Sequence, residues 1–160
     1  MSAALLASDA ALLATVRRHL ERQIESARRL LELVLRQGAA IRERDTEAVL
    51  ARLAEIKVEM AGRQALEDER DALIGQVGAR LGVGAGDVTL GALAGLAAPE
   101  EAAEIEARSA ELRGLLAEIA REHGINQALM RQELTFLDHL IRLVGEPPSD
   151  GGNRLMDVEA

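Results

Sequence analysis

The fold is decided by residues 13–41, which read LATVRRHLERQIESARRLLELVLRQGAAI. This stretch contains no proline and a single glycine. Its apolar or small residues recur at steps of three or four, at Leu13, Val16, Leu20, Ile24, Ala27, Leu31, Val34, Gly38 and Ile41. Such spacing is typical of a helix that packs lengthwise against another helix. We predict a helix from Ser8 to about Arg44, roughly 50 Å long at about 1.5 Å per residue.

The composition also favours helices over strands. Hydrophobic residues make up 48% of the 160 residues and charged residues 29%, a balance that suits amphipathic helices in one domain. Aromatic residues make up only 1%, because Phe136 is the single aromatic side chain. Strands draw on aromatic and β-branched residues, which are scarce here. The fold class is therefore predicted to be all-α.

Charge and composition exclude several kinds of partner. The net charge of −8 repels phosphates, so we expect no nucleic acid partner. There is no cysteine, hence no disulfide framework and no thiolate metal site. No run of about 18 apolar residues is present, so we expect no membrane insertion. A cytoplasmic location follows as the expectation, since the start of the chain also lacks the basic region of a signal peptide.

A second helix is predicted to begin after Asp45, which is a good N-cap residue. It carries apolar residues at Val49, Leu53, Ile56 and Met60, and again from Leu73 to Leu81. Between them, residues 62–71 are strongly charged. We expect one continuous helix with a loose or exposed middle; two helices that meet near Gly62 are the alternative.

The clearest break lies at residues 82–86, where three of five residues are glycine. Thr89 is predicted to cap a short helix through Leu90, Leu93 and Leu96. Pro99 suits the first turn of a last helix that runs to Val144. The result is an elongated antiparallel bundle in which a long hairpin, a short connecting helix and a third long helix pack as in a coiled coil. We predict one helical domain, residues 1–145, and a disordered tail, residues 146–160.

Residue patterns that would support catalysis are missing from the sequence. His19, His123 and His139 lack metal-ligand spacing, and no His-Glu-x-x-His run occurs. A phosphotransfer role for His19 is disfavoured, because the Lys-Gly pair usual in such modules does not follow it. The glycine-rich break lacks the lysine of a phosphate-binding loop. We therefore predict that the protein is no enzyme, with no catalytic residue, no cofactor and no metal.

The end of the last helix has more apolar surface than one packing seam needs. One stripe steps by four and three residues through Met130, Leu134, Leu137, Ile141 and Val144. A second stripe lies beside it and holds Leu129, Phe136, Leu140 and Leu143. Either two helices of the same bundle cover this wide face, or part of it stays open to bind an apolar segment of a partner. Phe136 would then be the natural anchor.

The order of several short segments resembles the FlgN family of flagellar type III export chaperones across residues 10–144. The resemblance is carried by Arg44-Asp45, Glu55-Ile56-Lys57, Leu81-Gly82, Thr89-Leu90 with Leu93, Glu111-Leu112-Arg113-Gly114-Leu115-Leu116 and Asn126-Gln127-Ala128-Leu129-Met130. The family often has two asparagines three residues apart on the last helix. Here His123 takes the first position and Asn126 the second.

The resemblance implies a chaperone for the hook–filament junction (hook-associated) proteins. Such a chaperone binds the C-terminal helical region of an unassembled subunit, prevents premature assembly and delivers it to the export gate or its ATPase machinery. The client site would lie within Ile119 to Val144. The predicted partner-binding residues are Asn126, Leu129, Met130, Phe136, Leu137, Leu140 and Leu143. The alternative is a self-associating coiled-coil scaffold without a flagellar client, which leaves a homodimer open.

Overall fold

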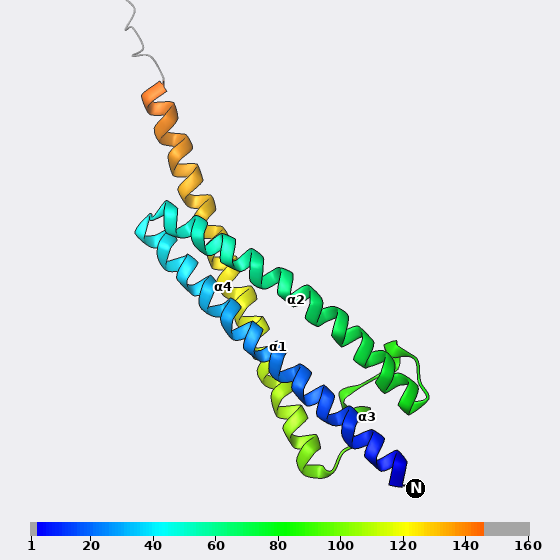
Figure 1. Ribbon diagram of the computed structural model, residues 1–160. Coiled ribbons are helices and arrows are strands. Elements are labelled where there is room, and N and C mark those ends of the chain that lie inside the picture. The colour runs from blue at the N-terminus through cyan, green and yellow to red at the C-terminus, as the bar shows by residue number, and fades with distance from the viewer. Residues whose placement is uncertain (1–2, 146–160) are drawn as a thin grey trace, which may run out of the picture.

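The computed structural model describes residues 3–145 and consists of helices joined by short connections (Figure 1). Within this range there is no strand, which confirms the all-α prediction. The elements are α1 (Ala3–Glu43), α2 (Thr46–Leu81), a 3₁₀ turn η1 (Ala85–Asp87), α3 (Leu90–Ala94) and α4 (Pro99–Gly145). The first helix is already formed at Ala3, so its predicted start at Ser8 was too late. The predicted tail, residues 146–160, lies outside the described residues.

The turn between α1 and α2 is closed by local hydrogen bonds. Arg44 adopts a φ of 57°, the left-handed conformation that reverses the chain. The Asp45 side chain accepts a 3.0 Å hydrogen bond from the backbone N–H of Ala48, as its predicted N-cap role requires. The backbone N–H of Asp45 in turn donates to the carbonyl of Ala40 at 3.0 Å. A tight hairpin results.

Helix α2 is continuous through Gly62, so the alternative of two helices is wrong. The expectation of an exposed middle is also wrong in part, because Arg63 and Leu66 are buried. Polar side chains on α1 make the burial of Arg63 tolerable. Its guanidinium donates to the side-chain oxygens of Gln23 and Ser26, both at 3.3 Å. A charged side chain can pack inside when its donors find acceptors there.

The connection from α2 to α4 lies at the end of the molecule opposite the α1–α2 turn, which we call the broad end (Figure 1). Gly82 ends α2 with a φ of 71°, a conformation that favours glycine. Thr89 caps α3 as predicted, accepting a 3.0 Å hydrogen bond from the backbone N–H of Ala92. Helix α3 ends at Ala94 and therefore stops short of Leu96. The core cluster joins four elements here, through Leu13, Val77, Leu93 and Ile105.

Helix α1 is the central element of the fold. It packs against α2 on one side and α4 on the other, whereas α2 and α4 make few contacts with each other. Helix α4 ends one residue beyond the predicted Val144. It is also long enough that its last turns extend beyond the turn between α1 and α2 (Figure 1). The molecule is thus elongated, with an end where one helix stands alone.

Candidate partner-binding site

One stripe of α4 faces α1 over most of the length of α4. Ile105 is fully buried and Asn126 is 1% exposed. Between and after them, the stripe continues through the partly buried Leu112, Ile119 and Leu129. Ion pairs flank it, and the atoms joined are Arg17 Nη1 to Glu104 Oε2 at 3.3 Å, Arg108 Nη2 to Glu21 Oε1 at 3.3 Å, and Arg28 Nη2 to Glu111 Oε1. These contacts fix how far α4 is shifted along α1.

Asn126 lies inside this contact. Its Nδ2 donates a 2.8 Å hydrogen bond to the backbone carbonyl of Val34. Gly38 gives it room, since a Cβ there would lie 2.6 Å from Asn126 Oδ1. We predicted a partner contact for Asn126, but the structure places its side chain between α1 and α4, away from the exposed surface. We therefore assign Asn126 to the internal packing of the protein.

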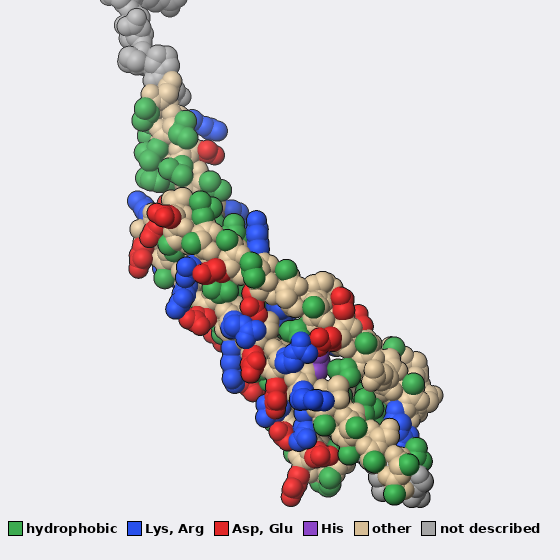
Figure 2. Space-filling model, viewed as in Figure 1, with side chains coloured by type: hydrophobic (Ala, Val, Ile, Leu, Met, Phe, Trp, Pro, Cys, Tyr) green, Lys and Arg blue, Asp and Glu red, His purple; other side chains and the backbone are tan. Residues whose placement is uncertain are grey.

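The other predicted residues fall into two groups. Leu129 and Met130 are half-buried beside the hairpin. Beyond them lies the projecting segment, residues 134–145, in which every side chain is exposed. The exposed fractions of its large apolar side chains are Leu134 62%, Phe136 45%, Leu137 50%, Leu140 38%, Ile141 67%, Leu143 61% and Val144 86%. The described helices therefore leave this face open instead of covering it. Figure 2 shows the apolar side chains gathered on it.

The apolar face of the projecting segment is unusually wide. At about 100° per residue, its seven large apolar side chains cover about half of the helix circumference. The other half carries Thr135, Asp138, His139 and Arg142. A helix that packs on a single partner needs an apolar stripe of only about 100°. A wide, exposed apolar face of this kind is typical of interaction surfaces.

Arg44 marks the point where α1 stops covering α4. Its guanidinium carbon lies 5.7 Å from the centre of the Phe136 ring, within the range of a cation–π contact. Its Nε lies 3.6 Å from Glu133 Oε2. Both contacts come from the hairpin turn itself. Phe136 thus stands at the boundary between the covered and the uncovered parts of α4.

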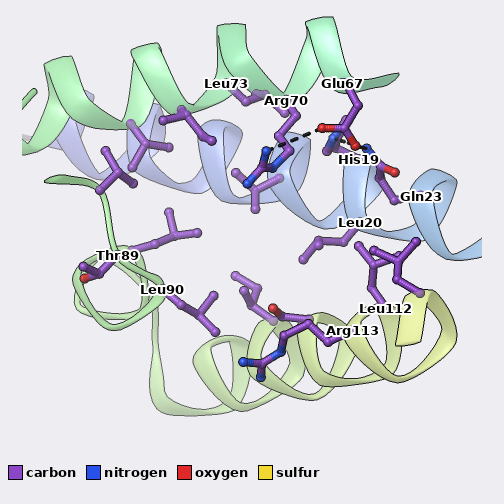
Figure 3. Close-up of a pocket in the computed structure, with 18 residues that line it drawn as sticks. His19, Leu20, Gln23, Glu67, Arg70, Leu73, Thr89, Leu90, Leu112 and Arg113 are labelled. Carbon is purple, nitrogen blue, oxygen red and sulfur yellow. Dashed lines mark hydrogen bonds and ion pairs between the residues drawn. The ribbon is translucent and has the colours of Figure 1, made fainter. Parts of the chain in front are cut away.

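A groove lies between α2 and α4 at the broad end of the molecule (Figure 3). It was not predicted from the sequence. It has a volume of about 550 Å³, with α1 as its floor and α3 beside it. Apolar side chains make up most of its lining, among them Leu20 from α1, Leu73 from α2 and Leu112 from α4. No local pattern reveals such a groove, because its walls come from segments far apart in the sequence.

His19 lies at the edge of this groove and is 8% exposed. Its Nε2 is 3.3 Å from Gln23 Nε2, and its Nδ1 is 3.5 Å from Glu69 Oε2. Burial lowers the pKa of His19 below 6.5 and outweighs the nearby Glu69 carboxylate, which acts in the opposite direction. A histidine enclosed in this way is badly placed to receive a phosphoryl group from another protein. His123 and His139 are exposed.

Two further observations concern ions and membranes. Among residues 3–145, no three His, Asp or Glu side chains are grouped so that they could hold a metal ion. In the same part of the chain, none of the helices has the length and apolar character needed to cross a bilayer.

The structure thus defines a class of protein: an all-α hairpin with a long third helix, half of whose free end is apolar and exposed. The family comparison identifies the group within this class. A model of the FlgN family, described as "FlgN protein", matches residues 12–154, and the chain belongs to this family. FlgN proteins are flagellar export chaperones, a family without enzymatic function. No curated protein and no solved structure matches the chain.

Proposed function

We propose that this protein is a cytoplasmic chaperone for the hook–filament junction proteins of the flagellum. It binds the C-terminal helical region of an unassembled subunit, keeps that region from associating too early, and delivers the subunit to the export gate or its ATPase machinery. The observation that supports this most directly is the projecting segment, residues 134–145, with its uncovered apolar face.

The driving force for client binding would be mutual burial of apolar surface. Each Å² of apolar surface removed from water contributes about 25 cal/mol, before the costs of association and side-chain ordering. An assembly helix of an unassembled subunit has an apolar face that is also uncovered. Binding would hide both faces at once, which explains how one contact keeps the subunit soluble and blocks its assembly.

Chaperone and client are expected to bind through the residues that the hairpin leaves exposed. These are Phe136, Leu137, Leu140 and Leu143, with the half-buried Leu129 and Met130 at the edge of the surface. Phe136 is the largest of them and is held at its base by Arg44. Aromatic side chains packed near the centre of an interface tend to contribute much of its binding energy.

Size-exclusion chromatography with light scattering tests the proposal. The protein is run alone and then mixed with a purified hook–filament junction subunit, and a complex of defined stoichiometry is expected. The double variant Phe136→Ala/Leu140→Ala should weaken the complex at least tenfold while its circular dichroism stays helical. The matched control is Leu50→Ala/Val58→Ala on α2, where both side chains are also exposed. If neither the parent protein nor the control variant forms a complex with the subunit, the proposal is wrong.

A self-associating scaffold is the competing proposal, because a second copy would cover the same apolar face. It predicts a dimer whose mass does not change when the flagellar subunit is added. In that case Phe136→Ala/Leu140→Ala would convert the dimer into a monomer.

A further inference from the structure

The stripe by which α4 contacts α1 does not stop where α1 stops. It consists of two sets of residues that repeat every seven positions: Ile105, Leu112, Ile119, Asn126, Glu133 and Leu140, and Arg108, Leu115, Glu122, Leu129, Phe136 and Leu143. Every member from Ile105 to Glu133 is buried or partly buried. Phe136, Leu140 and Leu143 continue the same line and are exposed. The change in burial follows the end of α1 and involves no change of pattern in α4.

Helix α1 ends abruptly at the turn into α2. The helix ends at Glu43, and Arg44 turns the chain back into α2. Beyond Arg44 no described element lies along Phe136, Leu140 and Leu143. The space that α1 would occupy if it were longer by about three turns is therefore open (Figure 1). The α4 side of the α1–α4 interface therefore continues past the end of α1, and no described helix packs on it there.

We propose, on the basis of the proposed function, that the client supplies two helices to the projecting segment. One client helix would lie end to end with α1, on Phe136, Leu140 and Leu143, which we call the α1-side seam. The second would pack on Leu134, Leu137, Ile141 and Val144, which we call the outer seam. The partner is thus a helical hairpin with two amphipathic helices rather than a single peptide.

The width of the apolar face requires two helices. Leu143 and Leu134 lie at opposite edges of this face, about 180° apart on a helix that turns about 100° per residue, and Ile141 lies next to the Leu134 edge. One partner helix covers about 100° and would leave one seam in water. Two helices would enclose the apolar half and leave the polar half, with Asp138 and Arg142, facing solvent. Each client helix needs about 18 Å to cover residues 134–145 at about 1.5 Å per residue.

The absence of cysteine from the chain makes a direct test possible. Single variants Leu143→Cys and Ile141→Cys are labelled with benzophenone maleimide and irradiated in complex with a purified hook–filament junction subunit. Peptide mapping should find the two labels on two different helices of one client molecule. Val58→Cys on α2, which is 75% exposed, is the control and should give no adduct.

The possible outcomes distinguish this inference from the proposed function. If both labels map to the same client helix, the two-helix arrangement is wrong while the chaperone proposal stands. If labelled and unlabelled protein both fail to form a complex, the chaperone proposal itself is wrong. Crosslinks to a second copy of this chain would overturn both.

Affinity measurements give a second, independent test. The pair Phe136→Ala/Leu140→Ala removes apolar surface from the α1-side seam, and Leu137→Ala/Ile141→Ala removes it from the outer seam. Both variants should weaken binding of the subunit at least tenfold. A loss confined to one pair would mean that one client helix suffices and would overturn the inference.

Discussion

Asn126 on α4 donates a 2.8 Å hydrogen bond to the backbone carbonyl of Val34 on α1, and both residues are almost fully buried. The bond joins two helices at residues separated by most of the chain. Because the amide reaches a backbone atom, it specifies one position of α4 along α1. That position determines how much of α4 extends beyond the hairpin, and so it sets the size of the projecting segment.

Gly38→Ala should destabilise the protein, because the new Cβ would lie 2.6 Å from Asn126 Oδ1. Overpacking costs about 1–3 kcal/mol, and alanine returns about 1 kcal/mol through its helix propensity. Gly62→Ala isolates the propensity gain, since nothing lies within 4 Å of its Cβ. Urea unfolding should place Gly38→Ala about 1–3 kcal/mol below Gly62→Ala. Equal stabilities would contradict the close approach.

Asn126→Ala should lower the free energy of unfolding by about 1–2 kcal/mol, through the lost hydrogen bond and the space it leaves. It should also remove the clash, so that Gly38→Ala costs nothing in the Asn126→Ala background. Isothermal titration with the flagellar subunit should give a similar affinity for Asn126→Ala and the parent protein. A large loss of affinity in a stable Asn126→Ala variant would return this residue to the client site.

Arg80→Met should lower the free energy of unfolding, because it leaves the buried Asp9 carboxylate without its partner. Arg80 Nε and Nη2 contact the two carboxylate oxygens of Asp9 at 2.5 and 2.9 Å, and the Asp9 side chain is 9% exposed. Removing the guanidinium should cost about 3 kcal/mol in urea unfolding. Arg36→Met breaks an exposed pair with Glu32, at 59% and 62% exposure, and should cost less than about 0.5 kcal/mol. Similar losses for both variants would show that the buried Asp9–Arg80 pair contributes no more to stability than an exposed pair.

Stability should fall as the pH drops below 6.5, and His19 is the reason. Burial holds its pKa below 6.5 in the folded protein, despite the opposing effect of Glu69. The unfolded chain therefore takes up a proton first, and protons favour unfolding. The neighbouring Arg22 adds to this effect, while Glu67 opposes it.

Thermal unfolding between pH 7.5 and 5.5 measures the contribution of His19. His19→Gln should make the melting temperature less dependent on pH across this range, and His139→Gln, at an exposed position, is the matched control. A second loss is expected at lower pH, outside this range, because below pH 4.5 the unfolded chain takes up a proton at Glu104 before the folded protein does. Hydrogen bonds from Arg17 and Arg108 hold its pKa below that value when folded. An identical slope in His19→Gln and the parent protein would exclude His19 as the cause.

Much of the fold could be predicted because its signals are local. The repeating seam of α1, the Asp45 and Thr89 caps and Pro99 at the start of α4 each depend on neighbouring residues only. Arg63 could not be placed, because its burial depends on acceptors that Gln23 and Ser26 present from another helix. The exposure of the apolar face was equally beyond reach, since it depends on where α1 ends relative to α4.

Ile105 and Ile141 should respond in opposite ways to truncation, although both lie on α4. Ile105 is 0% exposed in the core, whereas Ile141 is 67% exposed on the projecting segment. Ile105→Ala should lower the free energy of unfolding by about 2–5 kcal/mol, and Ile141→Ala should change it by less than about 0.5 kcal/mol. Urea titrations of both variants measure this difference. Affinity for the flagellar subunit should fall only in Ile141→Ala, measured where both variants are folded. If Ile141→Ala instead destabilised the isolated protein, the projecting segment would be packed against something in solution, and its availability to a client would have to be abandoned.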